Sequence, residues 1–565
     1  MDKRAIYHEP DSNMCFPTSK NSIVLRLRVS NLDSFDSICV IYGEKYTFHT
    51  KQKSLAMKIK YRDELYSYYE ANIKLEDVRF VYVFDLSIDN QRFYYSEDRI
   101  TLTYDFSYAY YNCFQYPYIN DVDIMKKIDW VEHAVFYEIF VDRFFEGSWD
   151  KDRKYINSKW NELPKQHSFF GGDLKGVYDK LSYLKELGVT AIYLTPIFSS
   201  ISNHKYDIHD YYKIDPQFGN DRLFKELVSK AHKMDLRIIL DGVFNHTSNL
   251  LMQFEDVVKK ERKSKYFDWF IIHGDSVDMK KVNYETFSNC YYHPKFNTSN
   301  KEVQKFLLDI GKYYIEHFDI DGWRLDVADE LSHDFWRSFR KEIKRLKPDC
   351  FLVGENWHNS YPFLKGDQFD SIMNYSFTKI MLDYLALDRI DAKDTADKLN
   401  SLLIRNTDMV NHMMLNLLDS HDTDRFYSSL GKDKNKLLLA LAIQFVFLGV
   451  PGLYYGIEIP LEGGYDPDNR RCMNWQAIDY VSEYFKYLKQ IVALRKEEVL
   501  CSGEIEITSK NQILCIKRYN EKEQIILYVN HSKESILLNK KEMMSFRYKE
   551  GILEPNGFLI ERVIA

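Results

Sequence analysis

The chain has 565 residues, 45% of them hydrophobic, so it can bury a large core, and its length predicts about three or four domains. Its formal net charge of −7 is small for this length and is spread along the chain, which argues against a nucleic-acid partner and an anionic membrane surface. The 43 tyrosines, 37 phenylalanines and 8 tryptophans suit a protein that stacks flat apolar faces on sugar rings, although most of these side chains must form core.

The N-terminal segment Met1–Pro10 has no apolar run of the kind found in secretory signals, and no stretch approaches about 18 uninterrupted apolar residues. The eight cysteines are scattered without any C-x-x-C pair, so they predict neither a zinc site nor a disulfide framework. We therefore expect a cytoplasmic protein without a membrane partner.

Residues 1–122 are expected to form an N-terminal β-sandwich. The runs Ser22–Val29 and Val78–Phe84 are rich in β-branched or aromatic residues, and the first alternates apolar with charged side chains. No stretch of helical periodicity with comparable strength interrupts them.

Strands and helices alternate through the central domain, residues 123–500. The apolar run Trp130–Phe140 is predicted to be the first strand and Val189–Leu194 the second, with a helical spacing between them. A further helix, Leu223–Met234, leads into a third strand that ends near Asp241. This βαβα rhythm predicts a parallel sheet.

Three further segments complete the predicted organisation. Residues 247–302 have mixed patterning and are too long for an ordinary loop, so we expect an inserted subdomain there. After the apolar helix Leu437–Leu448, the run Pro451–Gly456 is predicted to be the last strand of the sheet. Short strands such as Ile525–Val529 then predict a small C-terminal β domain over residues 501–565.

The segment Ile320–Glu330 is a short strand-like run with an arginine and a carboxylate two residues apart. Side chains on a strand alternate faces, so Arg324 and Asp326 are predicted to project to one side, with Trp323 and Leu325 on the other. A neighbouring guanidinium lowers a carboxylate's pKa by about 1–3 units, so Asp326 is expected to be ionised at neutral pH and available as a nucleophile. For this motif alone, a structural ion pair is the alternative interpretation.

Three other stretches place an acid after an apolar run. The acids are Asp241, Glu355, and Asp419 with Asp422 close behind. Acids at the C-terminal ends of several buried parallel strands are typical of an active site on a (β/α)8 barrel. The four stretches together favour an α/β protein with this barrel, an inserted subdomain, an N-terminal β-sandwich and a C-terminal β domain.

In these motifs the sequence resembles the α-amylase family of glycoside hydrolases, and the resemblance covers nearly the whole chain. The segments Asp241–His246 and Gly322–Asp326, then Glu355, then His421 with Asp422, match the four family motifs in order.

A closer resemblance is to the neopullulanase, cyclomaltodextrinase and maltogenic amylase subgroup. It is carried by the carbohydrate-binding-like N-terminal β domain, by His293–Asn297 and by Glu462–Arg471. The subgroup usually has Met or Leu in place of His293 and Leu in place of Phe296.

The resemblance implies a retaining mechanism with three carboxylates. Asp326 would attack the anomeric carbon, and Glu355 would protonate the departing oxygen and then deprotonate the incoming water. Glu355 would need a raised pKa, from a partly desolvated site beside another carboxylate. Asp422 would hold sugar hydroxyls and stabilise the oxocarbenium-like transition state, although by itself it could equally cap a loop.

The same resemblance assigns further residues to substrate binding. Tyr206 would stack under the sugar whose bond is cut, His246 and His421 would donate hydrogen bonds to its hydroxyls, Asp466 with Arg470 would close its non-reducing side, and Trp357 and Tyr375 would face the leaving group. Each of these residues alone could be structural. The full predicted substrate-binding set is His204, Tyr206, His246, Arg324, Trp357, Tyr375, His421, Asp466 and Arg470.

Some members of the subgroup bind calcium near the first barrel loop through Asn and Asp side chains. In the corresponding stretches of this chain, Asp150, Asp152 and Asp173 keep oxygen ligands, and a solvated acidic loop is the competing interpretation. No cofactor is expected to be required, and calcium stays open. A further departure is Ile457, where the family usually has an acid.

Three functions compete. The first is an α-glucan hydrolase that cleaves α-1,4 bonds, or α-1,4 and α-1,6 bonds, in cyclodextrins, maltooligosaccharides or pullulan, with or without transfer to other sugars. The second is another enzyme of the family, such as a branching enzyme or an isomerising glucosyltransferase. The third is a non-catalytic carbohydrate-binding protein. Retention of the three carboxylates and Arg324 argues against the third, because binding alone needs no nucleophile and acid together.

The resemblance also implies a homodimer. The N-terminal β domain of one chain would help to wall the active site of the other, so that small or cyclic maltodextrins are preferred to starch. A monomer whose N-terminal domain is a passive appendage is the alternative.

Overall fold

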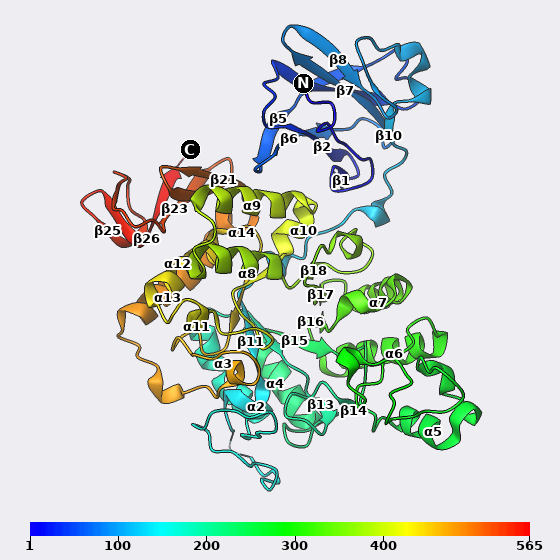
Figure 1. Cartoon of the computed structure of the whole chain (residues 1–565), viewed down its shortest axis with the longest axis vertical. Coiled ribbons are helices and arrows are strands. Elements are labelled where there is room, and N and C mark those ends of the chain that lie inside the picture. The colour runs from blue at the N-terminus through cyan, green and yellow to red at the C-terminus, as the bar shows by residue number, and fades with distance from the viewer. Residues whose placement is uncertain (148, 565) are drawn as a thin grey trace. The chain divides into compact units, whose positions relative to one another are not determined.

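The computed structural model describes residues 1–147 and 149–564. By contacts within the chain, these residues form two compact units (Figure 1). The second unit consists of Ile128–Asp388 and Met413–Gly503, and the first contains Met1–Lys127, Arg389–His412 and the chain from Glu504 onward. Within the described residues, no helix has the length and apolar composition that crossing a membrane would require.

The second unit is built on a closed barrel of eight parallel strands. The strands follow one another around the barrel in chain order, and the last pairs with the first. Closure between the sixth and seventh strands comes from a parallel bridge between Met373 and Leu415, where the Asn374 N–H donates to the Leu415 carbonyl at 2.8 Å. The predicted (β/α)8 barrel is therefore confirmed. The strands are β11 (Phe136–Ile139), β12 (Ala191–Leu194), β15 (Arg237–Gly242), β16 (Gly322–Leu325), β17 (Phe351–Gly354), β18 (Ser371–Ile372), β19 (Leu415–Leu417) and β20 (Val450–Tyr454).

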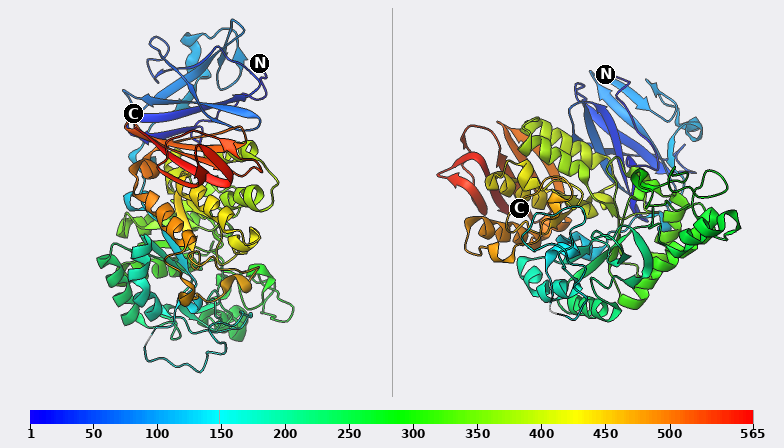
Figure 2. Two further views of the ribbon diagram at one scale, coloured as in Figure 1. Left: turned by 90° about the vertical axis from the view of Figure 1, so that its left-hand side faces the viewer. Right: turned by 60° about the horizontal axis from the view of Figure 1, so that its bottom comes forward.

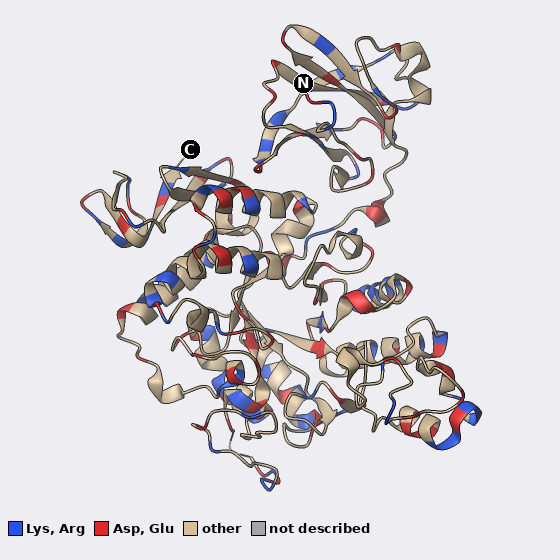
Figure 3. Ribbon diagram, in the orientation of Figure 1, with Lys and Arg blue, Asp and Glu red and all other residues tan. Residues whose placement is uncertain are grey.

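Helices lie outside the barrel strands (Figures 1 and 2). Several begin at an Asp, Asn or Ser whose side chain accepts from a free N–H of the first turn, which explains where they start. In α7 the buried positions are apolar, and the charged residues, coloured in Figure 3, are exposed or half-buried. The main helices are α3 (Leu174–Leu187), α4 (Asp221–Lys233), α6 (Lys301–Phe318), α7 (His333–Leu346), α8 (Tyr375–Met381), α12 (Lys434–Val446) and α13 (Glu483–Ala493).

The first barrel strand is shorter than the sequence predicts. Residues Asp129–Glu132 form the helical turn α1, and pairing with the neighbouring strands begins only at Phe136. The turn bonds its own backbone, because Val131 donates to the Ile128 carbonyl at 2.9 Å. An apolar run alone does not distinguish a buried turn from a buried strand, and so the predicted strand Trp130–Phe140 is wrong in its first half.

The predicted insertion lies between β15 and α6. It contains one helix, α5 (Met252–Lys260), and several short 3₁₀ turns. Single bridges pair His246 with Lys295 and Phe270 with Phe296, so the insertion folds back on the residues that follow β15.

The first unit contains the two flanking β domains. The N-terminal sandwich consists of a sheet in the order β1-β2-β6-β5 and a sheet in the order β4-β3-β7-β8-β9, with β10 on β7; the C-terminal sheet has the order β21-β22-β23-β26-β24, with β25 on β26. Both predicted β domains are confirmed. Their strands are β1 (Cys15–Ser19), β2 (Ser22–Ser30), β3 (Ser37–Glu44), β4 (Lys53–Ala56), β5 (Lys58–Arg62), β6 (Tyr66–Lys74), β7 (Phe80–Ile88), β8 (Gln91–Tyr95), β9 (Ile100–Thr101), β10 (Phe114–Tyr116), β21 (Glu504–Lys510), β22 (Ile513–Tyr519), β23 (Glu523–Asn530), β24 (Ile536–Leu537), β25 (Met544–Lys549) and β26 (Ile552–Ile564).

A buried arginine joins the sandwich to the segment Arg389–His412, which contains α9 (Ala392–Ile404). Arg26 is fully buried, and its guanidinium lies 2.8 Å from the Glu70 carboxylate and 2.5 Å from the Asp408 carboxylate. A buried cation needs such partners, so these carboxylates tie the segment to the first unit.

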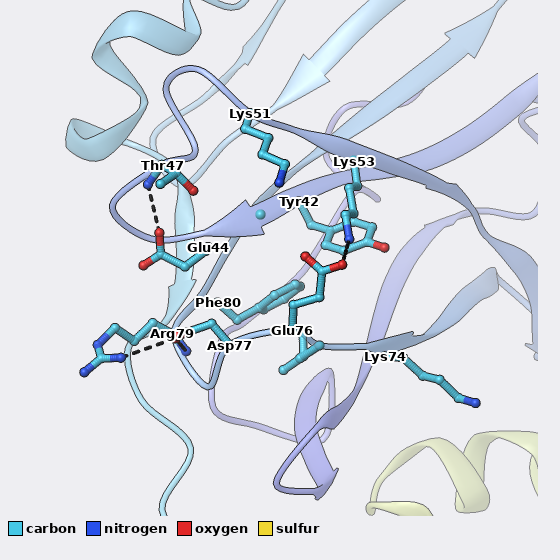
Figure 4. Close-up of a pocket in the computed structure, with 12 residues that line it drawn as sticks. Tyr42, Glu44, Thr47, Lys51, Lys53, Lys74, Glu76, Asp77, Arg79 and Phe80 are labelled. Carbon is cyan, nitrogen blue, oxygen red and sulfur yellow. Dashed lines mark hydrogen bonds and ion pairs between the residues drawn. The ribbon is translucent and has the colours of Figure 1, made fainter.

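The sandwich also has a hollow of about 230 Å³ beside β3 and β4 (Figure 4). The Phe80 ring forms part of its wall. Four of its charged side chains pair with one another: Lys53 lies 2.5 Å from Glu76, and Arg79 lies 3.3 Å from Asp77. The lining has four Lys or Arg side chains and three Asp or Glu side chains, so its net charge is small.

Candidate active site

Four carboxylates from the C-terminal ends of four barrel strands meet one guanidinium. Arg324 Nη1 lies 3.1 Å from Asp241 and 2.7 Å from Asp326, and Nη2 lies 3.0 Å from Glu355 and 3.7 Å from Asp422. The strands bring these residues together because parallel strands of a barrel end at the same rim. The predicted convergence of the acid-bearing stretches is thus observed, with Arg324 at its centre.

The fourth predicted stretch contributes Asp422 to this cluster, while Asp419 has a different role. The Asp419 carboxylate accepts from the Phe426 N–H at 2.8 Å, at the start of the short helix α11 (Phe426–Ser429). Burial raises the pKa of Asp419 to about 6. Asp419 therefore shapes the loop after β19.

Asp326 follows β16 directly, on the side of the strand that carries Arg324, as predicted. Its Oδ1 accepts from Arg324 Nη1 at 2.7 Å, whereas its Oδ2 has no hydrogen-bond partner among the described residues. One oxygen thus fixes the carboxylate and the other keeps its lone pairs free of donors, which suits a nucleophile.

The protonation of Asp326 differs from the expectation. Burial raises the pKa of Asp326 well above its ordinary value, and the carboxylates of Glu355 and Asp241 act in the same direction, while Arg324 opposes them. Arg324 does act to lower this pKa, as predicted, but burial and the neighbouring carboxylates outweigh it, so the predicted net lowering is wrong. An enclosed carboxylate loses its hydration, and here one guanidinium is shared among several carboxylates. The charge of Asp326 consequently depends on that of Glu355.

Both oxygens of Glu355 are held. Oε2 accepts from the Val327 backbone N–H at 2.9 Å, and Oε1 accepts from Trp357 Nε1 at 3.1 Å. Val327 has a φ of 44°, an unfavourable conformation for a β-branched residue. Val327 directly follows Asp326, and its backbone conformation aims its N–H at Glu355. Strained backbone of this kind is found at active sites, where the surrounding structure holds it in place.

His421 connects Asp422 to the first barrel strand. Its Nε2 lies 3.1 Å from Asp422 Oδ2 and 2.5 Å from the Tyr206 hydroxyl, and its Nδ1 bonds the Glu138 carboxylate. Burial acts to lower the pKa of His421, but the carboxylates of Asp422 and Glu138 together raise this pKa above its ordinary value. His421 and Arg324 in turn lower the pKa of Asp422, against the effect of burial, so Asp422 is held as the anion.

Tyr206 lies flat against His421, with ring centres 5.5 Å apart and planes 13° from parallel. Its hydroxyl donates to Asp241 Oδ2 at 2.8 Å. Asp466 and Arg470 pair at 3.0 Å, and Arg470 also lies 3.5 Å from Asp422. Tyr206 therefore lies against His421, and Arg470 links Asp466 to Asp422, while the predicted contacts of these residues with sugar stay predictions.

Trp357 and Tyr375 form a stacked pair, with ring centres 3.7 Å apart and planes 3° from parallel. Tyr375 is buried and its hydroxyl lies 3.1 Å from Ser420 Oγ, while Trp357 is 43% exposed. The outer face of the indole is thus open to solvent, directly beside Glu355.

His246 is buried and His204 is half-buried, and desolvation lowers the pKa of His204 to about 3 and that of His246 well below its ordinary value. His204 Nδ1 lies 3.2 Å from Ser202 Oγ, whereas His246 Nε2 has no hydrogen-bond partner among the described residues. His293 packs near His246, with ring centres 4.9 Å apart. The contacts of His204 and His246 with sugar remain predictions.

The three candidate calcium ligands do not converge. Asp150 and Asp152 are exposed, and Asp152 accepts from the backbone N–H of Lys154 at 2.9 Å. Asp173 is buried and bonds the ammonium of Lys151. Among the described residues, which leave out Ser148 of this loop, no group of three or more His, Cys, Asp or Glu side chains is arranged to hold a metal ion. These residues do not fit a calcium site.

Two supporting residues were not predicted as part of the site. Glu138 on β11 bonds His421, and Tyr193 on β12 donates its hydroxyl to Asp241. Each lies in a short, otherwise mainly apolar strand. A polar side chain in such a strand was the feature of the sequence that could have indicated a role in the site.

A closed parallel barrel whose strand ends gather a nucleophilic aspartate, a held glutamate and a third carboxylate around one arginine is the catalytic domain of a glycoside hydrolase. The model of the alpha amylase catalytic domain matches residues 138–489, and that of the alpha amylase N-terminal ig-like domain matches residues 1–120. The chain belongs to the α-amylase family.

Relatives within the family are similar over nearly their full length. The chain is 40% identical to a cyclomaltodextrinase of Thermoanaerobacter pseudethanolicus, over 99% of this chain and 98% of that protein. It is 38% identical to an intracellular maltogenic amylase of Bacillus subtilis strain 168, over 94% of this chain and 91% of that protein. A solved cyclomaltodextrinase structure superposes with a TM-score of 0.91 at 34% identity, over 100% of this chain and 99% of that one. The subgroup predicted from the motifs is confirmed.

Proposed function

We propose that this glycoside hydrolase cleaves α-1,4 glucosidic bonds, and α-1,6 bonds where they are presented, in cyclodextrins, maltooligosaccharides or pullulan with retention of configuration. The observation that carries the proposal is the pair Asp326 and Glu355 on one guanidinium, at 2.7 and 3.0 Å. The names of the relatives, cyclomaltodextrinase and maltogenic amylase, support this class of substrate.

The reaction takes two displacements. In the first, Asp326 Oδ2 forms a bond to the anomeric carbon while the bond from that carbon to the leaving oxygen breaks, and the leaving oxygen takes a proton from Glu355. In the second, Glu355 removes a proton from a water molecule, whose oxygen replaces Asp326 at the same carbon. Arg324 keeps the nucleophile oriented throughout, because it bonds the other oxygen, Oδ1.

The remaining residues act on the sugar whose bond is cut. Asp422 is held as an anion by His421 and Arg470, so it can accept hydrogen bonds from hydroxyls and offset the positive charge that develops in the transition state. The open face of Trp357 offers a stacking surface for the departing or accepting sugar.

The direct test is a pair of substitutions, Asp326→Asn and Glu355→Gln. Each should lower kcat on a maltooligosaccharide by about three orders of magnitude or more, since the first removes the nucleophile and the second the general acid. Asp424→Asn, at an exposed acid in the loop after β19, is the matched control and should keep activity. Near-normal turnover by either test variant would refute the role of that residue.

Hydrolysis and transfer share one covalent intermediate, so water and sugars compete for it. The exposed face of Trp357 next to Glu355 supports some transfer to sugar acceptors. Incubation with maltotriose tests this, because longer or α-1,6-linked products form only by transfer. A branching or isomerising enzyme would instead give such products without net gain of reducing ends.

A homodimer in the cytoplasm completes the proposal, with the N-terminal domain of one chain narrowing the active site of its partner. The matched N-terminal domain and the Bacillus relative named intracellular support these two points. Light scattering, together with the ratio of kcat/KM on β-cyclodextrin and soluble starch for the full chain and for a chain that starts at Asp121, tests the dimer. A monomer that prefers starch, with a ratio unchanged by truncation, would refute it. Fractionation of cells tests the location.

A further inference from the structure

The side chain of Lys151 is 1% exposed, an unusual position for a charged group in a surface loop. Its ammonium bonds the Asp173 carboxylate and donates to the Gly171 carbonyl at 2.5 Å, and Glu146 lies 3.9 Å away. The cation is thus enclosed by oxygen atoms, the kind of atom that a calcium ion also requires.

The Asp173 carboxylate has no capacity left for another partner. Oδ1 accepts from the backbone N–H groups of Gly147 at 3.0 Å and Gly176 at 2.7 Å, and Oδ2 accepts from Trp149 Nε1 at 3.0 Å and from Lys151. Four donors fill the roughly four lone-pair positions of an ionised carboxylate. Asp173 is also the N-cap of α3, so its orientation is fixed by the helix.

We propose that the Lys151 ammonium stands where a calcium ion would otherwise bind, and that it fastens the surrounding loop, residues 149–154, to the start of α3 without a metal. A divalent ion at the same oxygens would lie against the ammonium, where two cations a few ångströms apart repel strongly. The enzyme accordingly keeps this loop in place at any calcium concentration.

The fastened loop is connected to the sugar-binding side of the active site. Beside the carbonyl that Lys151 holds, the Gly171 N–H donates to Asp142 at 3.0 Å. Asp142 pairs with Arg143 at 2.7 Å, and Arg143 donates to the Arg470 carbonyl at 2.8 Å. Lys151 is therefore a positioning residue for Arg470, through a chain of buried contacts.

The experiment compares thermal unfolding midpoints in excess EDTA and in millimolar calcium. For the full-length natural chain, the two midpoints should agree. Lys151→Met should lower the midpoint by roughly 5 °C, because it leaves Asp173 as an uncompensated buried charge. Lys154→Met, at an exposed lysine of the same loop, is the matched control and should leave the midpoint unchanged.

Activity gives a second readout. Lys151→Met should lower kcat/KM on maltotriose relative to Lys154→Met, and Lys151→Arg, which keeps the charge, should recover part of both losses. Two results would overturn the proposal: a calcium-dependent rise of the natural chain's midpoint that Asp173→Asn abolishes, or equal midpoints for Lys151→Met and Lys154→Met. If Lys151→Met does not fold, metal analysis of the natural chain after gel filtration decides, since one retained calcium ion per chain that Asp173→Asn removes would also contradict it.

Discussion

Glu138→Gln removes the negative charge that His421 contacts through Nδ1, the ring nitrogen that does not face Asp422. Glu138 bonds His421 Nδ1 and, at 3.2 Å, the His421 backbone N–H, and its carboxylate helps to raise the histidine's pKa. A raised pKa keeps His421 protonated to a higher pH, so both ring nitrogens donate, one to Glu138 and one toward Asp422 and Tyr206. Without the carboxylate, His421 loses its proton at a lower pH.

The size of the effect follows from the one contact that is lost. A hydrogen bond to a charged group contributes about 1.5–3 kcal/mol, and each 1.36 kcal/mol is tenfold in rate, which gives a fall in kcat/KM of about tenfold to hundredfold. The glutamine oxygen can still accept from Nδ1, so the lower end is expected. The alkaline limit of kcat/KM should also move toward acid pH.

Initial rates on maltotriose between about pH 5 and about pH 8 measure both effects. Glu162→Gln, at an exposed acid, controls for the substitution itself. If Glu138 acts through His421, adding Glu138→Gln to His421→Asn should cause little further loss. A kcat/KM within about twofold of the natural enzyme, with an unmoved alkaline limit, would refute the reasoning.

Four further outcomes follow from the structure. The new reducing end should appear first as the α-anomer, which proton NMR in the first minutes resolves, and initial β-anomer would contradict two displacements. Trp357→Phe should keep the stack on Tyr375 but lose the N–H that holds Glu355, so it should lower kcat more than it raises KM; the reverse pattern would mean that the indole only binds sugar. Arg26→Met should destabilise the protein by about 3–5 kcal/mol by calorimetry, because two carboxylates lose their buried cation, and an unmoved transition would contradict this. Burial lowers the pKa of His8 to about 3, below its unfolded value, so His8 contributes stability that is lost as the pH falls from about 6.5 toward 3; urea unfolding of His8→Gln should show a shallower decline over that range.

Local patterns in the sequence were sufficient for much of the site. The alternation of side chains along β16 predicted that Arg324 and Asp326 share one side, and their observed contact at 2.7 Å confirms it. The apolar runs that end in acids predicted the barrel and the rim where Glu355 lies, because the period of a strand and the ends of parallel strands are properties of short segments.

Tertiary structure decided what depends on partners distant in the sequence. The rise in the pKa of Asp326 comes from enclosure and from Glu355, and the support of His421 comes from Glu138, on a strand that the chain leaves long before it reaches β19. The Lys151 ammonium reaches the Asp173 carboxylate only because the loop folds back onto the start of α3. Residue types and spacing identify which groups carry the chemistry, but burial and long-range contacts set their charges and their partners, since both depend on the whole fold.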